Sequence, residues 1–122
     1  MKVLAALNKW QRRQFNYGDA DCCQFAAFIV NELTGKDYAA DFRYQSELEA
    51  DNIINKFNGL KGLIVSILGE PSNELKDGDP CLLAVPLCGE LMGVKLGSHI
   101  VALTEKGMVR INERYLVCGW SV

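Results

Sequence analysis

The stretch DCCQFAAFIVNELTG, residues 21–35, carries the clearest structural signal in the chain. Its apolar residues and thiols recur at helical spacing, so one side of the predicted helix faces a core. Asp21 is a typical N-cap residue and makes a capping-box pattern with Gln24 three residues later. Gly35 suits the left-handed position that follows many helices. The sequence therefore predicts a helix that begins at Cys22 and ends just before this glycine.

Helical patterns fill the first half of the chain, and strand patterns fill the second half. We expect further helices over residues 2–13, 46–57 and 60–68. Short strand-like segments separated by turns follow at residues 81–86, 91–94, 99–104, 108–112 and 115–120. Helices first and strands second is the α+β pattern. With 122 residues, we expect a single domain over residues 1–122, in which N-terminal helices pack on a C-terminal antiparallel sheet.

Composition argues against several function classes. The chain has 49% hydrophobic and 23% charged residues and a formal net charge of −2. It has no basic stripe, so we expect no nucleic-acid binding. No segment is long enough to cross a bilayer, so we expect no membrane partner. The apolar run at residues 3–7 is too short for a signal peptide, so we expect cytoplasmic synthesis. We expect no cofactor, and no metal site either, because one histidine and no Cys-x-x-Cys pair leave too few ligands.

Cys22 is the candidate nucleophile. The first residue of a helix lies at the positive end of the helix dipole, where unpaired amides stabilise a thiolate and lower the thiol pKa. The alternative is that Cys22 is a small buried hydrophobe, as free cysteines often are. We assign that packing role to the other cysteines, which are Cys23, Cys81, Cys88 and Cys118.

His99 is the only histidine, so any cysteine–histidine mechanism must use it. In the predicted strand it shares a face with Val101 and Leu103, which we expect the helices to cover. A lone histidine on such a face is more often structural than catalytic. The presence of Cys22 at a helix start favours the interpretation of His99 as its base.

Polar residues near this pair are candidates for a supporting role. If residues 106–107 form a two-residue turn, Asn112 lies diagonally beside His99 on the same face and can orient its ring. A three-residue turn would point Asn112 outward instead. Tyr17 and Asp21 precede the cysteine closely, so we take both as candidate substrate-binding residues, although helix capping alone accounts for Asp21.

Together these residues resemble the NlpC-type papain-like cysteine peptidases, which cleave the peptide stems of bacterial cell walls. Residues 21–25 are similar to the family's Asp-Cys-Ser-Gly-Phe/Leu signature, and residues 75–79 are similar to the Leu-x-x-Gly-Asp turn that opens its sheet. Residues 98–100 resemble its Ser/Asp-His-Val/Ile strand. The segments 15–18, 25–27, 34–37 and 59–60 resemble small NlpC-like proteins of phages and prophages.

The resemblance implies a papain-like core with Cys22 as nucleophile, His99 as base and Asn112 as the third residue. It implies hydrolysis of an amide or peptide bond, with a peptidoglycan stem peptide as substrate, and a place in a phage tail beside other tail proteins. Two positions depart from the family. Phe15 replaces its oxyanion-hole tyrosine, and residues 23–24 replace its Ser-Gly. Losing one oxyanion donor costs about a hundredfold in rate. The alternative is therefore a catalytically inactive tail-tip or assembly module on the same fold.

Overall fold

The computed structural model describes residues 2–10, 13–17, 20–39, 43–86 and 89–122. Gly18, Cys88 and residues 11–12 of the expected first helix lie outside the described residues. The elements in chain order are α1 (Lys2–Trp10), α2 (Cys22–Thr34), α3 (Glu47–Lys56), α4 (Leu60–Leu68), β1 (Pro80–Val85), β2 (Gly89–Leu96), β3 (His99–Thr104), β4 (Gly107–Asn112), a 3-10 turn η1 (Glu113–Tyr115) and β5 (Leu116–Gly119). The predicted α+β class is confirmed.

Helix α2 forms with both predicted caps. The Asp21 carboxylate accepts a hydrogen bond from the Gln24 N–H at 2.9 Å, and Gly35 ends the helix in the left-handed region at φ 79°. The second carboxylate oxygen of Asp21 accepts a hydrogen bond from the Tyr44 hydroxyl at 2.6 Å. Asp21 therefore caps α2 and also ties the segment before α3 to the start of α2.

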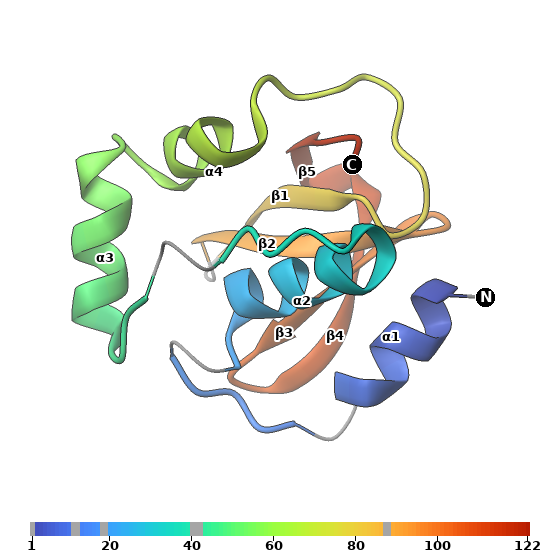
Figure 1. Cartoon of the computed structure of the whole chain (residues 1–122), viewed down its shortest axis with the longest axis horizontal. Helices are drawn as coiled ribbons and strands as arrows, with labels where there is room; N and C mark the ends of the chain where they lie inside the picture. The colour runs from blue at the N-terminus through green and yellow to red at the C-terminus, as the bar shows by residue number, and fades with distance from the viewer. Residues whose placement is uncertain (1, 11–12, 18–19, 40–42, 87–88) are drawn as a thin grey trace.

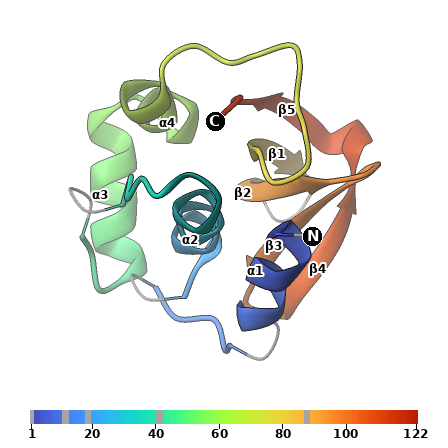
Figure 2. The same cartoon turned by 45° about the vertical axis from the view of Figure 1, so that its right-hand side comes forward.

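The strands form one antiparallel sheet in the order β4-β3-β2-β1-β5. Helix α2 packs on β1, β2 and β3, while α1 packs on α2 and α3 packs on α4. Figure 1 shows the helices on one side of the sheet, and Figure 2 shows α2 between the sheet and the α3–α4 pair. The helix side of the sheet joins the larger core, to which it contributes Leu82, Met92, Val94, Val101, Leu103 and Trp120. Among the described residues, no helix is long and apolar enough to cross a membrane.

The pairing of β2 with β3 is confined to one end of the two strands. It runs from Leu96 opposite His99 to Val94 opposite Val101. Gly93 permits the close approach there, because a Cβ on it would lie 2.6 Å from the Val101 carbonyl oxygen. Residues 89–93 of β2 pair with β1 but not with β3. The N–H groups there that point away from β1 are therefore open to partners other than β3.

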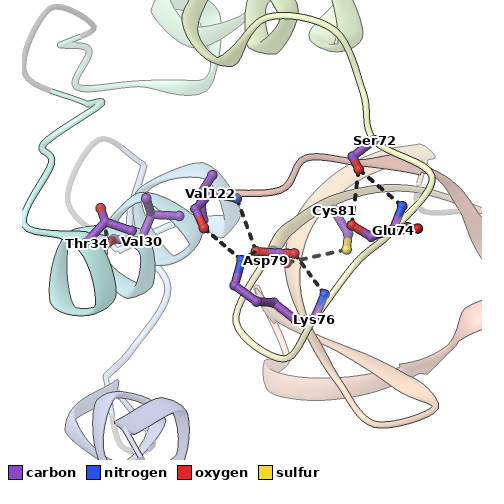
Figure 3. A network of polar contacts seen from close by, with 8 residues as sticks. All are labelled: Val30, Thr34, Ser72, Glu74, Lys76, Asp79, Cys81 and Val122. Carbon is purple, nitrogen blue, oxygen red and sulfur yellow. Dashed lines mark hydrogen bonds and ion pairs between the residues drawn. The ribbon is translucent and has the colours of Figure 1, made fainter.

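A buried carboxylate organises the entry to β1 (Figure 3). Asp79 is only 1% exposed. Its carboxylate accepts hydrogen bonds from the Lys76 N–H at 2.8 Å, the Lys76 ammonium at 2.9 Å and the Val122 N–H at 3.3 Å. The Lys76 ammonium also donates to the Val122 carbonyl oxygen at 2.7 Å. The residues that the sequence identified only as a turn therefore join β1 to a segment far along the chain.

We expect Asp79→Ala to lower the free energy of unfolding by about 3 kcal/mol, because it leaves the Lys76 and Val122 amides without their acceptor and removes the ion pair with the Lys76 ammonium. Urea denaturation followed by circular dichroism measures this change. The matched control is Asp77→Asn, which keeps an acceptor oxygen for the Gly97 N–H at an exposed position. A loss at Asp79 no larger than that of the control would contradict the role given to the buried carboxylate.

Candidate functional site

A cavity of about 690 Å³ lies beside the N-terminus of α2. This volume is within the range of roughly 300–1,000 Å³ that is typical of ligand pockets. The lining side chains come from α2, α3, α4, β1, β2, the β3–β4 hairpin and the segments that precede α2 and α3. Three predicted site residues, Tyr17, Asp21 and Cys22, are among them, whereas His99 and Asn112 are not. The apolar part of the lining includes Val30, Ile54, Leu60, Leu63, Met92 and Leu103.

Cys22 is partly buried, and its sulfur lies against a backbone amide of the sheet. The Met92 N–H donates to the Cys22 Sγ at 3.5 Å, and the Cys23 Sγ lies 4.0 Å from it. The hydrogen bond from Cys23 lowers the pKa of Cys22, burial opposes this effect, and the Met92 amide lowers the pKa further. The same thiol–thiol contact, together with burial, raises the pKa of Cys23. Cys22 is therefore the more acidic thiol of the pair.

His99 lies on the predicted face but at the wrong end of the strand. It shares a side with Val101 and Leu103, yet it is exposed, and its Nδ1 lies 3.3 Å from the Ser98 hydroxyl. Its neighbour across the ladder is Leu96. Leu96 is four residues from Met92, or about 13 Å along β2. Proton transfer requires heavy atoms within about 3 Å, directly or through one water. The expected meeting of Cys22 and His99 is therefore not found.

Asn112 lies directly opposite His99 rather than diagonally beside it. The two-residue turn of the hairpin consists of Glu105 and Lys106, one residue earlier than expected, so the register is shifted by two residues. A shift of two keeps the alternation of faces, so the predicted face of Asn112 is confirmed. Its side-chain oxygen accepts a hydrogen bond from the Arg114 N–H at 2.9 Å and caps η1. The structure thus gives this side chain a local capping role.

Tyr17 lies at the cavity in an acidic setting. Its ring meets the ring of Phe15 edge-on, with the centroids 4.9 Å apart. Burial raises the pKa of the Tyr17 phenol, and the nearby carboxylates of Glu47, Glu105 and Asp51 raise it further. The phenol is therefore protonated at neutral pH, and its hydroxyl is available to a ligand as a hydrogen-bond donor.

Asp21 lines the cavity as part of its framework. It is 3% exposed, and its oxygens accept hydrogen bonds from the Gln24 N–H and the Tyr44 hydroxyl. Burial raises the pKa of Tyr44 well above its usual range, followed by the charges of Cys23 and Asp21. The Tyr44–Asp21 bond therefore persists across neutral pH. Asp21 holds the wall of the cavity in place, and its expected contact with a substrate stays a prediction.

Several lining residues were not predicted from the sequence. Glu47 and Asp51 lie one turn apart on α3, and Glu105 lies in the β3–β4 turn. The i, i+4 spacing of the two α3 acids within a predicted helix was a usable signal. Nothing in the local pattern predicted Met92 or Glu105, because their positions beside Cys22 and Tyr17 depend on strand register.

Comparison with known families gives a match to the whole chain. A family described as "Domain of unknown function (DUF6950)" matches residues 1–122. The chain belongs to this family. The match includes Cys22, the sheet and every described residue that lines the cavity, so the whole site lies within the DUF6950 domain. A search of curated proteins finds no match to the chain.

The thiol pair predicts a measurable pH effect. We expect Cys22 to react with iodoacetamide at a lower pH than an ordinary thiol, whose pKa is about 8.5. Cys23→Ala removes the hydrogen bond that lowers the pKa of Cys22, so the midpoint of the pH–rate profile should move to higher pH. Peptide-resolved mass spectrometry measures the rate at each pH.

The control variant for this measurement is Cys118→Ala, which changes a partly buried thiol that does not line the cavity. It should leave the midpoint for Cys22 unchanged. An unchanged midpoint in Cys23→Ala would show that the Cys23 thiol does not stabilise the Cys22 thiolate.

Proposed function

We propose that the protein is a non-hydrolytic binding module on a papain-like, NlpC-like core, and that the cavity beside α2 holds a segment of a partner protein. The observation that carries this proposal is the contact between the Cys22 Sγ and the Met92 N–H. An amide of an apolar strand residue occupies the position where a thiol hydrolase needs a base. The resemblance to small phage and prophage proteins makes a phage tail-tip or assembly complex the expected setting.

The surroundings of the thiol favour binding over amide hydrolysis. Cleavage of an amide by a thiolate requires a group that gives a proton to the departing amine. Across the part of the chain that the structure describes, no imidazole or carboxylate hydrogen-bonds to the Cys22 sulfur. A lowered thiol pKa can supply the nucleophile, but it does not supply this acid. Cys22 is thus a thiol of lowered pKa without the proton donor that a peptidase needs.

The walls of the cavity support a binding role. Half-buried side chains such as Ile53, Ile54 and Leu91 give the lining apolar surface that still contacts solvent, on a framework held by the Tyr44–Asp21 hydrogen bond. Covering apolar surface contributes about 25 cal/mol for each Å² removed from water. A partner side chain that fills this space therefore gains affinity without any chemical step.

The hydrolase with Cys22 and His99, which the resemblance implies, predicts a different outcome in the same experiment. We incubate the protein and its Cys22→Ala variant with purified peptidoglycan and with stem peptides, and follow the products by mass spectrometry. In parallel, we measure the alkylation rate of Cys22 at neutral pH in the wild type and in His99→Ala.

We expect no product that depends on Cys22, and an alkylation rate in His99→Ala within about twofold of the wild type, because the imidazole lies about four residues along the sheet from the thiol. Cleavage that disappears in Cys22→Ala would overturn the proposed function. A large loss of Cys22 reactivity in His99→Ala would do so as well.

A further inference from the structure

The rim of the cavity is more acidic than the chain as a whole. Among the lining residues, Glu47, Asp51, Glu90 and Glu105 are exposed carboxylates, and Lys106 is the exposed cation. The formal net charge of the entire chain is only −2. The acids come from separate elements, α3, β2 and the β3–β4 turn, so the fold rather than a local charge run gathers them.

Among the described residues, none of these four acids forms an ion pair. Glu47 and Asp51 are one turn apart on α3, where like charges repel. Glu47 and Asp51 of α3 and Glu105 of the hairpin turn line the same cavity as Tyr17, so the fold brings acids from two distant elements to one site. A low-dielectric apolar wall beneath such charges concentrates their potential.

The helix that carries two of these acids also has an exposed apolar side chain outside the cavity lining. Leu48 follows Glu47 on α3 and lies one turn before Asp51. It is 69% exposed, which makes it the most exposed of the large hydrophobic residues that the structure describes. An occupant that covers Leu48 as well as the cavity must be larger than a small molecule. The combination of cavity, acidic rim and exposed leucine therefore fits an extended ligand.

We propose that the cavity beside α2 takes a basic, apolar peptide segment of a partner protein, with apolar side chains inside the cavity and lysine or arginine against Glu47, Asp51 and Glu105. This inference rests on the proposed function and names the chemistry of its partner. Electrostatic complementarity of this kind selects partners and speeds association more than it adds affinity. Binding should therefore discriminate between peptides by charge and should weaken with salt.

The thiol inside the cavity provides a direct test, because a bound segment must shield Cys22 from alkylation. We use three matched synthetic peptides: leucine alternating with lysine, with glutamate, and with serine. For each peptide we titrate the protection of Cys22 against iodoacetamide at low salt and at about 0.5 M salt. We expect the lysine peptide to protect best and to lose most of its advantage at high salt.

Charge variants of α3 refine the test. Glu47→Gln combined with Asp51→Asn should weaken the protection by the lysine peptide roughly threefold to tenfold. The control is Glu74→Gln combined with Glu113→Gln, which removes two exposed acids that do not line the cavity and should change nothing. Circular dichroism and the alkylation rate without peptide verify that each variant is folded.

A further variant separates a peptide from a small cationic ligand. Leu48→Ser should weaken protection by the lysine peptide and leave protection by decyltrimethylammonium unchanged. If the detergent protects as well as the peptide and Leu48→Ser affects neither, the occupant is a small cation and the peptide assignment is overturned.

The remaining outcomes separate the two proposals. If all three peptides protect equally, the binding function stands and the selectivity for a basic partner is wrong. If none protects, both proposals fail. If a peptide is cleaved in a reaction that needs Cys22, the proposed function fails first, whatever the charge of the peptide.

Discussion

The site depends on how the first turn of α2 is held. The Asp21 carboxylate pairs with the Gln24 amide inside the helix and with the Tyr44 hydroxyl outside it. The first bond fixes where α2 begins. The second holds the segment before α3 against the start of α2. Because Cys22 is the next residue, its distance from the sheet is set by the same contacts. The cavity is the space that remains between these fixed parts.

The helix boundaries and the fold class could be predicted because they depend on local chemistry. The cap at Asp21, the glycine after Thr34 and the run of apolar residues between them act within one element, so neighbouring residues suffice to identify them. Strand alternation likewise predicted the face of His99 and of Asn112. Helix ends and strand faces can therefore be predicted from the local sequence alone.

The arrangement of the site could not be predicted in the same way. Alternation gives the face of a strand residue, but it does not give the position along the strand at which a helix will cross. Helix α2 meets β2 at Met92, four residues from the partner of His99. The hairpin turn formed one residue earlier than expected, which moved Asn112 from the diagonal position to the one opposite His99. Both outcomes depend on packing between distant segments, for which the sequence carries no short pattern.

The hydrogen bonds to the buried Asp79 carboxylate affect the order in which the chain folds during synthesis. The carboxylate at the start of β1 takes one of its donors from a residue 43 positions downstream. Until that residue has left the ribosome, the buried Asp79 carboxylate lacks one of its hydrogen-bond donors. Burying the carboxylate in a closed sheet is then less favourable. The helices are made first and pack through contacts nearer in sequence. We therefore expect translation to yield a helical intermediate whose sheet becomes stable only after Val122 has emerged.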